Sequence, residues 1–153
     1  MKKLIVFLLM LIFVLGLTMF QSESLHELFL FDSNTFYIYS NSQNNNIGSG
    51  EIVKNGDGEI VKFDRLELIE NYHKLNLIAG ESLVIKNLTL NQIMRKLNLE
   101  VLSVENFNEI FVINGYSNKL KNYLNVDGKK QNVQIKYCLN YALIGYPLIM
   151  QGF

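Results

Sequence analysis

The longest apolar run in the chain lies at its N-terminus. Residues 4–20 carry no charge, Lys2 and Lys3 precede them, and the polar residues 21–24 follow. A helix of this length spans about 25 Å at about 1.5 Å per residue, slightly less than the hydrocarbon core of a bilayer. A globular helix would show a polar face, and this run shows none. We therefore expect residues 1–24 to be a signal peptide or a membrane anchor.

The sequence leaves cleavage of this segment open. Small residues stand at Gly16 and Thr18 and again at Ser22 and Ser24, but neither pair is the preferred Ala-x-Ala. Retention would tether the protein to the membrane through its apolar run, whereas cleavage would release it. Lysines favour the cytoplasmic side, so in both cases we expect residues 25–153 to form a single extracytoplasmic domain, secreted or anchored.

The first half of the domain shows strand and turn patterns. Residues 35–40 are aromatic and β-branched, which predicts a strand, and residues 41–50 form a polar loop. Gly-Glu-Ile-Val-Lys occurs at residues 50–54 and again at 58–62, with Asn-Gly-Asp between them. Asn-Gly and Asp-Gly favour the positive φ of tight turns, so we predict a β-hairpin. The stretch lacks the Lys-Ser/Thr of a phosphate-binding P-loop.

A helix is predicted after this hairpin, with Asp64 as its N-cap and Glu67 completing a capping box. Apolar residues at helical spacing predict its buried face: Leu66, Ile69, Tyr72 and Leu75. We expect this helix to end at Gly80 and a strand to follow at residues 81–86.

A second capping box, formed by Thr89 and Gln92, begins the most regular helical pattern in the chain. Its apolar residues recur at i, i+3, i+4 and i+7, namely Leu90, Ile93, Met94 and Leu97. We expect these residues to face the core.

The pattern then changes to a period of two residues. Strands are predicted at residues 100–105 and 109–114, the second internal to the sheet because it is apolar at four successive positions. Ser117 is predicted to cap a short helical turn over residues 118–124, and residues 126–129 are predicted to form a tight turn.

The last two strands are predicted as a pair. Apolar residues alternate with polar ones at Val133, Ile135, Tyr137 and Leu139, and residues 142–146 follow as the partner strand. Pro147 suits a sheet edge or the end of a strand. The predicted fold is α+β, a mainly antiparallel sheet with two helices packed on one face.

Three motifs in the C-terminal third resemble a known family. They are Gly-Tyr-Ser at residues 115–117, Gly-Lys-Lys-Gln-Asn-Val-Gln-Ile at 128–135 and Gly-Tyr-Pro-Leu-Ile at 145–149. Together they resemble the closing pattern of the YwmB-like secreted bacterial proteins. That resemblance implies an exported α+β domain of unknown function, with a fold described as similar to the TATA-box-binding protein. It implies no DNA binding and carries over no site residues, because fold does not transmit function.

Charge and cysteine content narrow the classes of partner. Residues 1–24 hold two lysines and one glutamate of the 14 basic and 14 acidic residues, so 12 and 13 remain in the domain. A surface so balanced gives no electrostatic reason to expect a nucleic acid partner. Cys138 is the only cysteine, so no internal disulfide can form.

No catalytic or metal-binding motif stands out. His26 and His73 have no further ligands at a recognised spacing, and Cys138 has no histidine near it in sequence. We therefore expect no metal, no cofactor and no enzymatic activity. The alternative is a small envelope hydrolase whose residues come together only in the fold, and paired carboxylates would suit it.

Tyrosines are the remaining candidates for binding, because tyrosine is enriched at interaction surfaces. The candidates we favour as binding residues are Tyr116, Tyr141 and Tyr146, which could share a surface with Tyr37 and Tyr39. The competing interpretation is that strands simply favour tyrosine. The leading hypothesis is a non-enzymatic binding or assembly module of the bacterial cell envelope, whose partner is an envelope protein or a cell-wall component.

Overall fold

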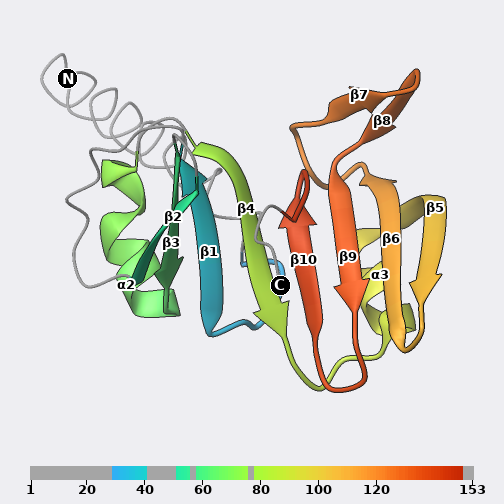
Figure 1. Cartoon of the computed structure of the whole chain (residues 1–153), viewed down its shortest axis with the longest axis horizontal. Coiled ribbons are helices and arrows are strands. Elements are labelled where there is room, and N and C mark those ends of the chain that lie inside the picture. Colours follow the sequence, from blue (N-terminus) through green and yellow to red (C-terminus); the bar gives the residue numbers. More distant parts are fainter. Residues whose placement is uncertain (1–28, 41–50, 56–57, 76–77, 150–153) are drawn as a thin grey trace, which may run out of the picture.

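Strands dominate the structure, a computed structural model that describes residues 29–40, 51–55, 58–75 and 78–149. Within these residues, eight strands form one sheet in the order β2-β3-β1-β4-β10-β9-β6-β5, and every pairing is antiparallel (Figure 1). Two α-helices, α2 and α3, accompany the sheet. The predicted α+β class is therefore confirmed. The expected signal or anchor segment, residues 1–24, lies outside the described residues.

The N-terminal half of the sheet follows the predicted hairpin. Strand β1 covers Thr35–Ser40, the range predicted from the sequence, and pairs with both β3 and β4. Strands β2 (Glu51–Asn55) and β3 (Gly58–Phe63) pair in antiparallel register, with Asn55 opposite Gly58. The duplicated pentapeptide thus supplies both strands of one hairpin. The predicted loop at residues 41–50 lies outside the described residues.

Helix α2 (Arg65–Asn71) begins at the predicted capping box. The Glu67 backbone N–H donates to Asp64 Oδ1 at 2.9 Å, and the Asp64 N–H donates to Glu67 Oε2 at 3.1 Å. The helix ends at Asn71, and the 3₁₀ helix η1 (Tyr72–Lys74) continues it. Strand β4 (Ile78–Ile85) then contains Gly80, so the predicted helix up to Gly80 is wrong.

The predicted buried face is confirmed for Leu75, which joins the core, and for Tyr72, which packs against it, but it is wrong within α2. Leu66 is 72% exposed and Ile69 48% exposed, whereas Leu68 is fully buried. A helix of fewer than two turns touches the sheet through little more than one side chain. Both Leu66 and Leu68 satisfy a local apolar pattern, so the tertiary contact decides which of them enters the core.

Helix α3 (Leu90–Leu97) matches its prediction closely. The Gln92 N–H donates to Thr89 Oγ1 at 3.3 Å, and the Thr89 N–H donates to Gln92 Oε1 at 2.8 Å, which confirms the capping box. Ile93 and Leu97 are fully buried. Asn98 ends the helix in the left-handed region with φ of 50°, where asparagine is better tolerated than most residues.

The C-terminal half is a four-stranded antiparallel meander of β5 (Leu99–Phe107), β6 (Ile110–Ser117), β9 (Val133–Tyr137) and β10 (Ala142–Tyr146). The predicted central position of β6 is confirmed, since it pairs with β5 and β9. Strand β10 lies between β4 and β9, so Pro147 follows the end of an internal strand rather than marking an edge. Leu139, predicted to continue the alternation of β9, lies beyond that strand and is 80% exposed.

The segment between β6 and β9 departs from the prediction. Instead of a helical turn, residues 118–123 are irregular and lead into a short hairpin of β7 (Leu124–Val126) and β8 (Lys129–Gln131). Asp127 and Gly128 have φ of 50° and 78°, which matches a tight hairpin turn and confirms the predicted turn. We call residues 121–131 the arm, because it extends beyond the main sheet (Figure 1).

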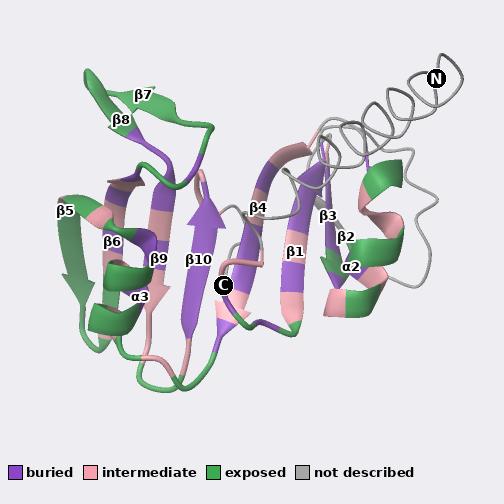
Figure 2. Ribbon diagram, turned by 180° about the vertical axis from the view of Figure 1, so that it is seen from behind, coloured by how far each residue is buried: buried purple, intermediate pink, exposed green. Residues whose placement is uncertain are grey.

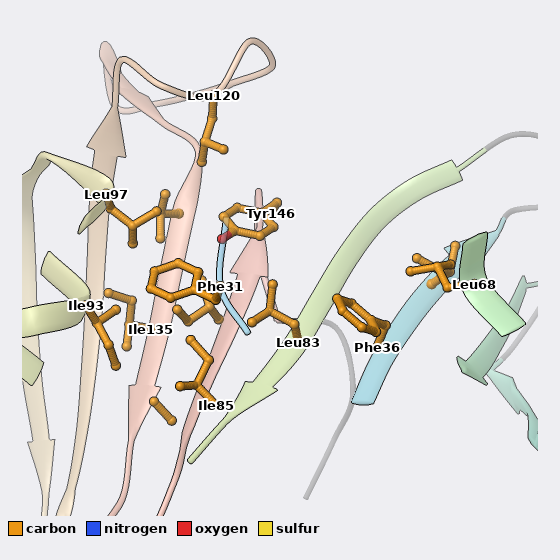
Figure 3. Packing of buried hydrophobic residues seen from close by; sticks show 14 of the residues in the cluster. Phe31, Phe36, Leu68, Leu83, Ile85, Ile93, Leu97, Leu120, Ile135 and Tyr146 are labelled. Atoms are coloured by element: carbon orange, nitrogen blue, oxygen red, sulfur yellow. The ribbon is translucent and has the colours of Figure 1, made fainter. Parts of the chain in front are cut away.

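Both helices cover the same face of the sheet, which we call the helix face. Leu68 of α2 and Ile93 and Leu97 of α3 belong to one core cluster with Phe36 of β1 and Ile135 of β9 (Figure 3). Burial decreases toward β5 and the arm, which are mostly exposed (Figure 2). The core therefore leaves the edge of the sheet at β5 only partly covered.

Candidate functional site

A cleft of about 550 Å³ opens on the helix face, where the two halves of the sheet meet. One wall comes from η1 and the start of β4, and the other from the irregular segment after β6 and the end of β10. The side chains that carry its polar chemistry are Tyr72, Glu81, Lys121, Asn122, Tyr123, Asn132 and Tyr146. The cleft thus combines three tyrosines with two amides and one charge of each sign.

Strand pairing fixes the floor of the cleft. Glu81 on β4 lies directly opposite Tyr146 on β10, and both point to the helix face. The Tyr72 hydroxyl donates a hydrogen bond to Glu81 Oε1 at 2.7 Å. Figure 3 shows the ring of Tyr146 near Leu120 and Phe31, at the upper end of the core. The floor is therefore rigid, because sheet register and core packing both hold it.

Asn132 anchors the arm and the wall beside it. Its Oδ1 accepts from the Ser117 N–H at 2.7 Å, and its Nδ2 donates to the Ser117 carbonyl at 2.8 Å and the Leu120 carbonyl at 3.3 Å. Asn132 and Leu120 are 1% and 5% exposed. One buried amide thus closes the base of the insertion between β6 and β9.

A second contact ties the insertion to α3. Lys119 Nζ donates to the Lys96 carbonyl at 2.6 Å, in the last turn of the helix, where a cation also complements the helix dipole. The arm itself is held by a cation–π contact, with Lys130 Nζ 4.5 Å from the centroid of Tyr123.

The structure does not gather the predicted binding tyrosines on one surface. Tyr146 lines the cleft on the helix face. Tyr116 points to the opposite face, because its neighbour Gly115 lies opposite Val133 on the helix face. Tyr141 lies in the turn between β9 and β10, at the other end of these strands. Tyr37, with Tyr39, alternates with buried Ile38 and so points away from the helix face.

Sequence reasoning missed Tyr72 and Glu81 as partners. Tyr72 was assigned to the buried face of a helix and Glu81 to the start of a strand, and neither assignment brings them together. Their spacing of nine residues matches no local periodicity, since the chain reverses between η1 and β4. No signal in the sequence could have identified this pair.

The turn at Cys138 contains a second polar contact. A hydrogen bond between the Tyr141 hydroxyl and the Cys138 sulfur, together with burial, raises the pKa of Tyr141 above its ordinary value. Cys138 itself is half-buried.

We expect Cys138→Ala to lower the pKa of Tyr141 toward the ordinary value near 10. The pKa of Tyr141 is higher in the folded protein than in the unfolded chain. The neutral side chain therefore stabilises the fold at any pH below the ordinary pKa, and this stabilisation is lost as pH rises through the folded pKa. NMR titration of ring-labelled tyrosine in the variant and the unmodified protein measures the shift. An unchanged Tyr141 titration would contradict the assigned contact.

The histidines provide no metal site in the described chain. His73 is exposed in η1, and His26 lies outside the described residues. Across residues 29–40, 51–55, 58–75 and 78–149, no group of three or more His, Cys, Asp or Glu side chains could hold a metal ion. Over the same residues no helix is long and apolar enough to cross a membrane.

Comparison with known proteins leaves the site without a template. No protein-family model, curated protein or solved structure matches this chain. The resemblance of residues 115–149 to the YwmB-like secreted proteins therefore stays a prediction.

Proposed function

We propose that this protein is a non-enzymatic binding or assembly module of the bacterial cell envelope, and that its cleft holds the partner. The cleft at the junction of the two half-sheets carries this proposal. Its tyrosines offer large, rigid contact surfaces with a polar end, and such side chains are common at binding sites. The expectation of an envelope location rests on the apolar run at residues 4–20.

The charges of the cleft bear on the kind of partner. Glu81 and Lys121 bring opposite charges to one site, and Asn122 adds an amide donor and acceptor. These groups suit a partner that is polar and carries both charges. An envelope protein segment or a peptide-bearing cell-wall component has this character.

Photo-crosslinking from Asn122, which is exposed and lines the cleft, tests the binding role. A benzophenone amino acid at this position in the full chain should give an envelope adduct in cells. The matched control is the same amino acid at Leu139, which is exposed in the turn between β9 and β10. Equal adducts from both positions, or none from Asn122, would count against the cleft as the binding site.

The hydrogen bond between Tyr72 and Glu81 favours a second candidate, the small envelope hydrolase. A carboxylate that accepts a hydrogen bond from a tyrosine in a concave site can act as a general base. However, no Ser, Cys or His side chain belongs to the described lining of this cleft, so an attacking group would have to be a tyrosine, Lys121 or water.

Glu81→Gln separates the two candidates. This change keeps the size of the side chain and an acceptor for Tyr72 but removes the base. A hydrolase should lose about 10²-fold or more of its release of fragments from cell-wall material, measured by mass spectrometry. A binding module should show no turnover before or after the change, whereas its Asn122 adduct should weaken because the cleft loses the Glu81 charge. Turnover in the unmodified chain that Glu81→Gln abolishes would make the hydrolase the better proposal.

A further inference from the structure

Strand β5 forms an unusual edge of the main sheet. It is nine residues long, and seven of these residues are exposed, all except Leu99 and Leu102. Natural proteins commonly protect a sheet edge with charged residues, proline, a bulge or a very short strand. Strand β5 has two glutamates and one bulge, but it is long and has no lysine, arginine or proline. Strand β2 at the other edge has five residues and contains Lys54. A bulge near Val101 and Ser103 leaves the rest of β5 in regular register.

The two sides of β5 differ in chemistry. Val101 and Val104 pair with Gly115 and Ile113, so they point to the helix face, and they are 39% and 57% exposed. Glu100 and Glu105 pair with Tyr116 and Val112, so they point to the opposite face. We call these the apolar side and the acidic side of β5. Glu109, in the turn after β5, adds a third negative charge.

The arm has the complementary pattern. Register places Leu124 opposite Gln131 and Val126 opposite Lys129 on one side of the hairpin. Lys130 lies opposite Asn125 on the other side and stacks over Tyr123. The first side, which carries Leu124 and Val126 together with Lys129, we call the apolar side of the arm. The second side, which carries Lys130, we call its cationic side. Residues 121–130 are all exposed, so the arm presents these groups to a partner.

We propose that the arm of one copy of this protein adds as a strand to the β5 edge of a second copy. Strand addition extends a sheet, so the faces of the two elements continue into one another. When the apolar side of the arm meets the apolar side of β5, its cationic side meets the acidic side. One geometry therefore satisfies the apolar contact and the charge pairing together. Because the arm and the edge are different surfaces, the contact is heterologous.

The charge distribution supports a second copy as the occupant of this edge. The insertion carrying the arm holds Lys119, Lys121, Lys129 and Lys130 against one acid, Asp127. Strand β5 and the turn after it hold three acids and no base. Opposite charges on two exposed, extended elements of one chain make each the natural partner of the other. The arm shares Lys121, Asn122, Tyr123 and Leu124 with the wall of the cleft. The contact itself is made at the β5 edge, so this inference does not depend on what the cleft binds.

Cysteine crosslinking between two differently tagged full-length copies tests the contact in cells. In a Cys138→Ser background, one copy carries Val104→Cys and the other Leu124→Cys, and a short bismaleimide joins them. A band containing both tags is expected. The control pairs Leu124→Cys with Leu66→Cys, an exposed apolar position on α2. If the Val104 pair gives no more product than the Leu66 pair, the proposal is wrong. That is also the result expected if the arm binds an anionic lipid or a wall polymer instead of a second copy.

Charge variants test the orientation of the arm. Lys130→Glu on the Leu124→Cys copy should reduce the crosslink about tenfold, whereas Lys129→Glu, the same change on the apolar side, should reduce it less than about threefold. Glu105→Lys on the Val104→Cys copy should restore its crosslink with the copy that carries Lys130→Glu. Such a rescue would not occur if Lys130→Glu had misfolded the arm. Equal effects of the two lysines, or no rescue, would overturn the proposal. Tyr72→Phe, which alters the cleft, should leave the crosslink unchanged.

Discussion

Asn132→Ala should lower the free energy of unfolding by about 3 kcal/mol and loosen the arm. The substitution leaves the Ser117 N–H and the carbonyls of Ser117 and Leu120 without the amide that now pairs them. Ser117 and Asn132 are both buried, so water does not easily replace the lost bonds, and an unsatisfied buried group costs about 1–3 kcal/mol. The cleft should suffer too, since Asn132 and Leu120 both line it.

Urea unfolding followed by tyrosine fluorescence measures this loss, since the chain has no tryptophan. Hydrogen exchange of residues 118–132 should accelerate at the same time. Asn125→Ala makes the same chemical change on the exposed arm and should alter stability by less than about 0.5 kcal/mol. An Asn132→Ala variant that exchanges like the parent would show that other contacts hold the arm.

Gly145→Ala should be similarly damaging, with an expected loss of about 2–3 kcal/mol from overpacking. Gly145 lies in the internal strand β10, and residues 147–149 turn back over it. A Cβ at this position would lie 2.4 Å from the backbone carbon of Leu148 and 2.5 Å from the Ile149 nitrogen. These are backbone atoms, so no side-chain rotation can relieve the clash. The hydrogen bond from the Ile149 N–H to Gln134 Oε1, now 3.1 Å, should break.

Limited proteolysis should detect the release of residues 147–149 in the Gly145→Ala variant, and urea unfolding should report the loss of stability. Gly128→Ala is the matched control, because a Cβ there would meet nothing within 4 Å. Its φ of +78° still disfavours alanine, so we expect a cost of about 1 kcal/mol confined to the arm. If Gly145→Ala costs no more than Gly128→Ala, the terminal segment does not pack on β10 as described.

Local signals predicted much of the fold correctly. Strands β1 and β10 have the predicted bounds, and both capping boxes form with the predicted residues. The β2–β3 hairpin was predicted from residues that favour positive φ in tight turns. These features depend on residues close together in the chain, so the sequence pattern carries enough information to place them.

The errors occur where local patterns allow more than one outcome. Leu66 was predicted to face the core, but the docking of a short helix placed Leu68 there instead. After Ser117 a helical turn was predicted, but the chain forms a hairpin, whose base the Asn132 hydrogen bonds hold. In each case a long-range contact outweighs the local preference.

Of the candidate site, the sequence identified Tyr146 but not its neighbours. Tyr146 lines the cleft because β10 lies beside β4, two strands whose residues are far apart in the chain. Tyr116 and Tyr141, chosen for the same reason as Tyr146, lie elsewhere on the molecule. Residue type alone could therefore nominate tyrosines but could not group them.

By itself, the sequence determined the strands, the helix caps and the tight turns, because backbone preference and the period of apolar residues act over a few residues. Only the tertiary structure decided that β4 and β10 join the two half-sheets, and that a cleft opens at their junction. It alone also decided that the cationic arm stands apart from the acidic β5 edge (Figure 1). Those features come from side chains distant in sequence meeting in a packed core, and no local pattern encodes which of them will meet.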